Sequence, residues 1–184
     1  MVEVITMIFT GHLGDPAIIA GSGLGSMFLT ILGVAIICGM NSALSTLISQ
    51  CHGQNEKRLI GIYYNQARIV ITALFIPIMI IFWNADTIFI ALGFDPLVSH
   101  YARLFLLYKS PYLYFYSIFD ATKKLIFNTG YYNIPMYIQV GTTIVHPLWC
   151  YLFVHLFDMG IIGPPLAQSI SAVLNIAILS YVLQ

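Results

Sequence analysis

The charged residues of this chain are separated by long uncharged stretches. Forty consecutive positions between Asp15 and Glu56 contain no Asp, Glu, Lys or Arg, and neither do positions 125–157 or 159–184. The hydrocarbon core of a bilayer is about 30 Å thick, and a helix of about 20 mostly apolar residues crosses it. Each stretch exceeds that length, so the sequence predicts a protein whose helices lie in lipid.

The composition narrows the function classes further. Charged residues make up 8% of the 184 positions and hydrophobic residues 59%, whereas roughly a quarter of an average soluble domain is charged. The formal net charge is zero, which argues against a nucleic-acid partner. The three cysteines lack the spacing of a zinc site or a disulfide framework. We therefore expect no metal and no cofactor, and the absence of a recognisable nucleophile–base pair argues against an enzyme.

Turn-forming residues divide the apolar sequence into helices. The expected fold class is all-α: a polytopic transmembrane bundle of about five full spans plus the end of a preceding helix, in a single domain covering residues 1–184. The piece 4–9 is that helix end, and the piece 87–92 is too short to span and is expected at the interface. Since apolar segments stand at both ends, we expect a part of a longer protein. The spans are expected at residues 24–50, 59–83, 97–124, 134–156 and from Pro164 onward.

Basic residues indicate which helix ends face the cytoplasm. They gather at alternate connections, while the other connections contain acidic residues. The basic group is Lys57, Arg58, Arg68, Lys123 and Lys124, and the acidic group is Asp15, Asp86, Asp95 and Asp158. The pattern predicts a multi-pass membrane protein whose loops around Lys57 and Lys124 are cytoplasmic. The plasma membrane and an organellar membrane are both compatible with it.

Three stretches of the sequence resemble one family of membrane proteins. The most specific is GMNSALSTLISQCHG at residues 39–53, which is similar to the pattern G-x-x-x-A-L-x-T-x-x-x-Q-A-x-G and departs from it at Cys51. The others are GHLGD at 11–15 and HPL at 146–148, the latter followed by GIIG at 160–163 and AQSIS at 167–171. In this order, they resemble the multidrug and toxic compound extrusion (MATE) family of cation-coupled exporters.

The resemblance implies an architecture and an activity. Family members have two lobes of six spanning helices each, so this chain would form most of the N-terminal lobe, and its partner would be a C-terminal lobe or a second copy. The implied function is a secondary active antiporter that exports small organic, often cationic compounds in exchange for protons or sodium. The alternatives are a non-transporting structural or regulatory helical subunit and an inactive fragment.

Lys109 is the most costly residue to place in lipid. It lies about twelve residues into a span, near the bilayer midplane at about 1.5 Å per residue, where a charge costs about 2.5–3.5 kcal/mol on insertion scales. It should therefore face a cavity or a charged group. Either it lines a cavity and contacts substrate or a counter-ion, or it is a structural lysine paired with another helix. The family normally has an apolar residue here, so the resemblance implies no role.

Asp120 is the only acidic residue clearly inside an expected span. Transporters use buried carboxylates to couple transport to a cation or proton, and Asp120 is a candidate for that role. The alternative is an interfacial ion pair, because Lys123 and Lys124 follow at i+3 and i+4. The spacing favours the ion pair.

Polar residues and prolines supply the other candidates. A polar stripe at the end of the 24–50 span must face protein or water, and it either lines a transport cavity or packs against neighbouring helices. Its substrate- or ion-binding candidates are Asn41, Thr46 and Gln50. The hinge or kink candidates, each of which removes a backbone hydrogen bond within a span, are Pro77, Pro111 and Pro147.

Two further features are assigned structural roles. His146 precedes a proline inside an apolar segment and is expected to be an interior histidine whose ring nitrogens have hydrogen-bond partners. The stretch GSGLG at residues 21–25 has a small-xxx-small spacing but no preceding strand. It is therefore expected at a helix entry and at a helix–helix contact, not at a nucleotide.

Overall fold

The chain folds into a bundle of helices. The computed structural model describes residues 2–11, 15–157 and 159–182, and no strand is present among them, which confirms the all-α fold class. The α-helices are α1 (Val2–Gly11), α2 (Pro16–Leu29), α3 (Ala35–Gly53), α4 (Lys57–Trp83), α5 (Ala85–Ala91), α6 (Pro96–Asn128), α7 (Asn133–Tyr151) and α8 (Gly163–Val182). Short π-helical segments cover Thr30–Val34 and Leu152–Leu156, and a 3-10 turn covers Gly160–Ile162.

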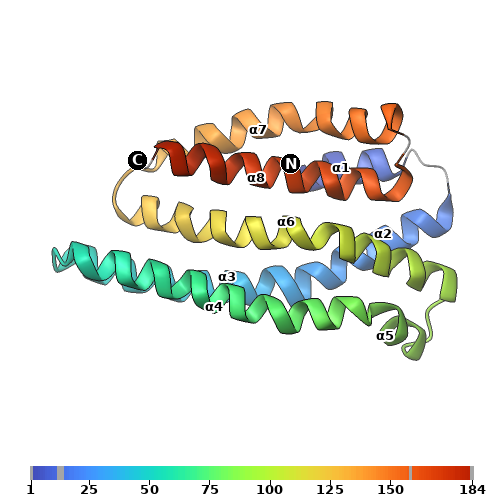
Figure 1. Cartoon of the computed structure of the whole chain (residues 1–184), viewed down its shortest axis with the longest axis horizontal. Coiled ribbons are helices and arrows are strands. Elements are labelled where there is room, and N and C mark those ends of the chain that lie inside the picture. Colours follow the sequence, from blue (N-terminus) through green and yellow to red (C-terminus); the bar gives the residue numbers. More distant parts are fainter. Residues whose placement is uncertain (1, 12–14, 158, 183–184) are drawn as a thin grey trace.

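Helix α6 lies in the middle of the bundle (Figure 1). It packs against α2, α3, α4 and α5, and also against α8. Helices α1 and α7 pack against α8 and against each other. Because both charged residues singled out in the sequence, Lys109 and Asp120, lie on α6, this central position determines their surroundings.

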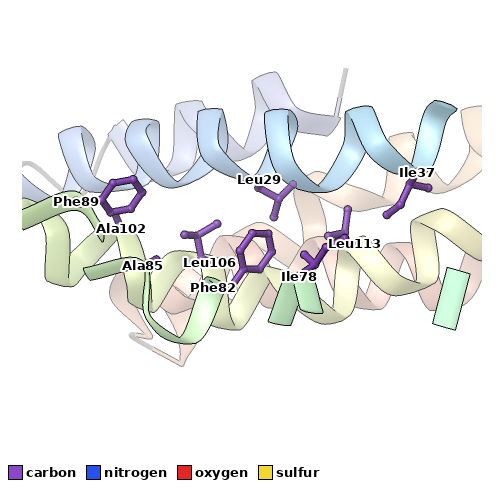
Figure 2. Packing of buried hydrophobic residues seen from close by; sticks show 9 residues of the cluster. All are labelled: Leu29, Ile37, Ile78, Phe82, Ala85, Phe89, Ala102, Leu106 and Leu113. Atoms are coloured by element: carbon purple, nitrogen blue, oxygen red, sulfur yellow. The ribbon is translucent and has the colours of Figure 1, made fainter. Parts of the chain in front are cut away.

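An apolar cluster holds α2, α3, α4 and α5 against α6 (Figure 2). Its side chains are almost fully removed from solvent, and each apolar Å² removed from water contributes about 25 cal/mol in a protein that folds against water. Between helices in lipid the same contacts act mainly through close packing. The cluster consists of Leu29, Ile37, Ile78, Phe82, Ala85, Phe89, Ala102, Leu106 and Leu113.

The first of the five expected spans, 24–50, begins earlier than the sequence predicts. Asp15 Oδ1 accepts a hydrogen bond from the Ala17 backbone N–H at 2.9 Å, and Pro16 occupies the first turn, so helix α2 begins at Pro16 and not near residue 24. An Asp–Pro pair starts α6 in the same way, where Asp95 accepts from the Leu97 N–H at 2.8 Å. A capping side chain followed by proline favours a helix start.

Small residues of α2 allow it to approach α6 closely. A Cβ atom added at Gly21 would lie 2.6 Å from the Cβ of Tyr101, and one added at Gly25 would lie 3.1 Å from the carbonyl oxygen of Ala102. The expected packing role of residues 21–25 is therefore confirmed. Their expected place at a helix entry is wrong, because they lie inside α2.

Three helical runs are long and apolar enough to cross a membrane: Pro16–Gly53, Lys57–Trp83 and Gly160–Tyr181. Helix α6 has 33 residues and lies beside them, but it contains buried charged side chains. Helix α7 ends at the expected residue, Leu156, once its π-helical segment is included. Residues 12–14 of the GHLGD stretch and Asp158 lie outside the described residues.

The helices continue through the three interior prolines. Pro77, Pro111 and Pro147 lie within α4, α6 and α7, respectively. At Pro111 the missing backbone N–H frees the carbonyl of Leu107, and the Ser110 hydroxyl donates a hydrogen bond to that carbonyl at 2.7 Å. A polar side chain thus replaces the lost backbone donor, as is usual for proline in lipid.

Candidate functional site

Lys109 forms an ion pair with the first helix. Its side chain is 1% exposed, and its Nζ lies 2.8 Å from Oε2 of Glu3 on α1. The two residues are 106 positions apart in the chain. The group that the burial of Lys109 requires therefore comes from within this chain, and the charge of the lysine is compensated.

Aromatic rings complete the surroundings of the Lys109 ammonium group. Its Nζ lies 5.0 Å from the centre of the Phe105 ring and 5.9 Å from the centre of the Tyr112 ring. Both rings belong to α6, about one turn on either side of the lysine. A cation within about 6 Å of a ring is attracted to its electron-rich face. One carboxylate and two rings therefore hold the ammonium in place.

Glu3 itself faces open space. Its side chain is 52% exposed and lines a hollow of about 510 Å3 that we name the α7 hollow. The volume is within the range of small-molecule sites. The lining comes from α1, α6, α7 and α8 and consists of Val2, Glu3, Tyr112, Tyr116, Phe119, Met136, Gln139, Val140, Thr143, Ile144, Gln168, Ser171, Ala172 and Asn175.

A second hollow meets the first at the same residues. This α2 hollow, of about 560 Å3, is lined by α1, α2, the following π-helical segment and α6. Glu3, Tyr112 and Tyr116 line both hollows. The two tyrosine rings stack on each other with centres 5.6 Å apart and an angle of 27° between their planes. The meeting point therefore combines one carboxylate with a broad aromatic surface.

Asp120 lies in a separate polar cluster. It is 4% exposed, and its Oδ2 accepts a hydrogen bond from Asn41 Nδ2 of α3 at 2.9 Å. Lys123 Nζ lies 3.2 Å from Oδ1 and Lys124 Nζ 3.9 Å from Oδ2. The ion pairs suggested by the i+3 and i+4 spacing are present, and Asn41 adds a contact across helices.

The polar stripe of α3 is divided between two environments. Asn41 is fully buried and belongs to the lining of neither hollow. Its side chain joins α3 to α6. Thr46 and Gln50 are exposed, and the Thr46 hydroxyl donates to the Ser42 carbonyl of its own helix at 3.2 Å. The structure does not bring these three candidates together.

A buried hydrogen-bond network joins α1, α7 and α8 behind the α7 hollow. His146 Nε2 lies 3.2 Å from the Thr6 hydroxyl, and His146 Nδ1 lies 2.9 Å from the Ser171 hydroxyl. Gln168 Nε2 donates to the Thr6 hydroxyl at 2.8 Å. Both ring nitrogens of the histidine thus have partners, which confirms the expected interior role.

The sequence reasoning missed Glu3, Tyr112, Tyr116 and Gln168. Glu3 precedes the helix end expected at residues 4–9, and the sequence pattern assigns it no role. The available signal was charge complementarity, because a buried lysine requires a buried or half-buried acid and few acids lie in apolar segments. Among the described residues, no group of three or more His, Cys, Asp or Glu side chains gathers in a way that could hold a metal ion.

The family of the chain follows from comparison with known proteins. A family model described as MatE matches residues 1–152. The chain belongs to the MatE family. In Arabidopsis thaliana, Protein DETOXIFICATION 17 is 31% identical over 180 residues and Protein DETOXIFICATION 13 is 28% identical over 179 residues. Each alignment covers 97% of this chain and 37% of the relative, so the chain spans little more than a third of these relatives.

Solved structures of MATE transporters have the same fold. The eukaryotic MATE transporter AtDTX14 matches with a TM-score of 0.93 at 22% identity, over 99% of this chain and 40% of AtDTX14. An inward-facing multidrug resistance MATE family transporter matches with a TM-score of 0.87 at 19% identity, over 100% of this chain and 41% of that transporter. The arrangement of α1–α8 is therefore that of part of a MATE transporter.

Proposed function

We propose that the protein containing this chain is a secondary active antiporter that exports small organic, often cationic compounds in exchange for protons or sodium. The observation that supports this most directly is the Glu3 carboxylate, which is half-exposed where two hollows meet in a chain of the MatE family. A carboxylate next to aromatic rings suits an amphipathic ligand with a cationic or hydrogen-bond-donating group.

The transport step requires access from both sides of the membrane. In secondary transporters a central site is exposed alternately when two structural units rock against each other. This chain would supply one unit, and a C-terminal lobe or a second copy would supply the other. We further propose that the loops around Lys57 and Lys124 are cytoplasmic, because basic residues gather there.

Two carboxylates on the described helices could couple transport to an ion. Glu3 is reachable from the hollows, whereas Asp120 is 4% exposed and already contacts two lysines. A coupling group must exchange a proton or bind sodium in one state and release it in another. Accessibility therefore favours Glu3 over Asp120 as the coupling carboxylate.

Substrate-driven proton or sodium flux in proteoliposomes of the intact protein tests this function. A fluorescent organic cation on one side should drive opposite movement of the ion. The double variant Glu3→Gln/Lys109→Met, which leaves no unpaired ammonium, should reduce that flux more than Asp120→Asn. The antiporter would be contradicted if correctly folded protein shows no flux with either ion and if neither Lys109→Leu nor Asp120→Asn changes the measured flux. That outcome would favour a non-transporting helical subunit.

A further inference from the structure

The two members of the Glu3–Lys109 pair differ in accessibility. The carboxylate is 52% exposed and the ammonium-bearing side chain 1%. Glu3 lines both hollows, and Lys109 lines neither. A ligand in either hollow can therefore reach the carboxylate, while the ammonium group stays behind it and is not itself a contact point.

Of the residues that the structure describes, Glu3 is also the only charged one in the lining of the α7 and α2 hollows. The remaining polar lining groups are hydroxyls and amides. Two α8 residues in the α7 hollow, Gln168 and Ser171, are buried, and within the described part of the chain Gln168 Oε1 has no hydrogen-bond partner. Because these α8 groups are buried, the half-exposed Glu3 carboxylate is the acceptor that we assign to a ligand that donates a hydrogen bond.

We propose that Lys109 is a specificity-determining residue, a fixed counter-ion that makes the Glu3 site accept both uncharged and singly protonated amphipathic molecules that donate hydrogen bonds. The inference rests on the proposed function, and it specifies the ligand class for that site. The stacked rings of Tyr112 and Tyr116 supply the surface for an aromatic body, and Glu3 accepts a hydrogen bond from the polar end.

The electrostatic reason is the short distance within the pair. With Lys109 Nζ 2.8 Å from one carboxylate oxygen, a cation that binds the open side of Glu3 is attracted by the carboxylate and repelled by the ammonium. The repulsion offsets part of the attraction, because the ammonium lies on the far side of the carboxylate and Coulomb energy falls with distance. An uncharged hydrogen-bond donor experiences neither the full attraction to the carboxylate nor the full repulsion from the ammonium. The pair should therefore favour a cation over an uncharged molecule of the same shape less strongly than a lone carboxylate would.

Two variants with the same residue at position 109 isolate the charge. Lys109→Met leaves an uncompensated carboxylate that faces the hollows, where water can hydrate it. The double variant Glu3→Gln/Lys109→Met removes both charges and keeps the methionine. The single variant Glu3→Gln leaves a buried, unpaired ammonium and is at risk of misfolding, so the comparison does not depend on it.

The probes are tryptamine, which is protonated at neutral pH, and tryptophol, which has the same indole body and an uncharged hydroxyl. Binding of each to the intact protein in lipid nanodiscs is measured by equilibrium dialysis without any ion gradient. The quantity of interest is the affinity for tryptamine divided by that for tryptophol. Partitioning into lipid cancels when this ratio is compared between variants in the same nanodiscs.

In Lys109→Met the ratio should rise by about tenfold over wild type, since one repulsive charge near the bound cation is removed. In the double variant it should return to within about threefold of wild type. An unchanged or lower ratio in Lys109→Met would overturn the inference, and so would failure of both probes to bind the wild-type protein. Because no transport is involved, each of these results is distinct from a failure of the antiporter proposal in the flux assay.

Discussion

Helix α6 carries two charged clusters about three turns apart, and they are built differently. Lys109 is paired with Glu3, which lies 106 residues away on α1 and is half-exposed to two hollows. Asp120 is paired with Lys123 and Lys124 of its own helix and is covered by Asn41. One cluster depends on the tertiary fold and faces ligand-sized space, whereas the other is largely local.

This difference indicates which cluster is structural and which is available for function. Asp120 has three nitrogen-bearing side chains around it, so the loss of any one leaves others in place. Lys109 has one acidic partner and two aromatic rings. A single substitution should therefore cost less stability in the first cluster than in the second.

The largest effect is expected for Glu3→Gln. The substitution leaves the Lys109 ammonium buried with no carboxylate, and breaking a buried pair in this way costs about 3–5 kcal/mol. Because Glu3 is half-exposed and water can enter the hollow, we expect a loss of about 3 kcal/mol, at the lower end of that range. The free energy of unfolding, measured by SDS titration of the intact protein in mixed micelles, checks this value.

The matched control is Glu3→Gln/Lys109→Met. Removing both charges avoids the unpaired ammonium, so most of the lost stability should return. If the double variant is as unstable as Glu3→Gln, the cost comes from lost packing at position 3, and the contrast between the two clusters is wrong.

The next effect is expected for Asn41→Leu. Asn41 Nδ2 donates to Asp120 Oδ2 at 2.9 Å and to the Ser117 carbonyl at 3.3 Å, and both contacts are buried. A hydrogen bond to a charged group contributes about 1.5–3 kcal/mol, so a loss of about 2 kcal/mol is expected in the same titration. Ser49→Ala is the control on α3, because that exposed hydroxyl bonds only within its own helix, and it should change stability by less than about 0.5 kcal/mol.

The ion pairs of the Asp120 cluster could be predicted from the sequence, whereas those of the Lys109 cluster could be predicted only in part. The i+3 and i+4 spacing of Lys123 and Lys124 from Asp120 is a property of any helix, so these ion pairs follow once the helix is recognised. The cost of burying Lys109 in lipid showed that it needed a charged group or a cavity. The identity of that group depends on how α1 packs on α6, which no local pattern contains.

The helix boundaries also divide into those that local sequence signals predict and those that depend on tertiary contacts. The all-α class, the end of α4 and the start of α6 follow from apolar length and turn residues. Helix α6 begins within one residue of the expected position but continues four residues past its expected end at 124. Helix α2 begins eight residues before its expected start, because the glycines at 21, 23 and 25 predict a helix entry there. Close contact with α6 makes glycine suitable there despite its low helix propensity.

A smaller effect is expected for Ser110→Ala, next to Lys109. The Ser110 hydroxyl satisfies the Leu107 carbonyl that Pro111 leaves without a backbone donor, so its removal should cost about 1 kcal/mol. In a Pro111→Ala background the backbone N–H returns, and Ser110→Ala should cost measurably less. Equal costs in the two backgrounds of this double-mutant cycle would show that the hydroxyl does not compensate for the proline.

The smallest effect is expected for Lys123→Gln. Its Nζ lies 3.2 Å from Asp120 Oδ1 and its side chain is 22% exposed, while Lys124 and Asn41 remain beside the carboxylate. Helical pairs of this spacing contribute about 0.3–0.5 kcal/mol and are screened by salt, so the loss should be about 0.5 kcal/mol at low ionic strength and should shrink toward zero as salt is added. The loss for Glu3→Gln should change little under the same conditions, because Lys109 is buried. The contrary outcome is a stability loss for Lys123→Gln that does not change with salt and is as large as that for Glu3→Gln. It would show that the Asp120 cluster depends on single contacts as much as the Lys109 cluster does.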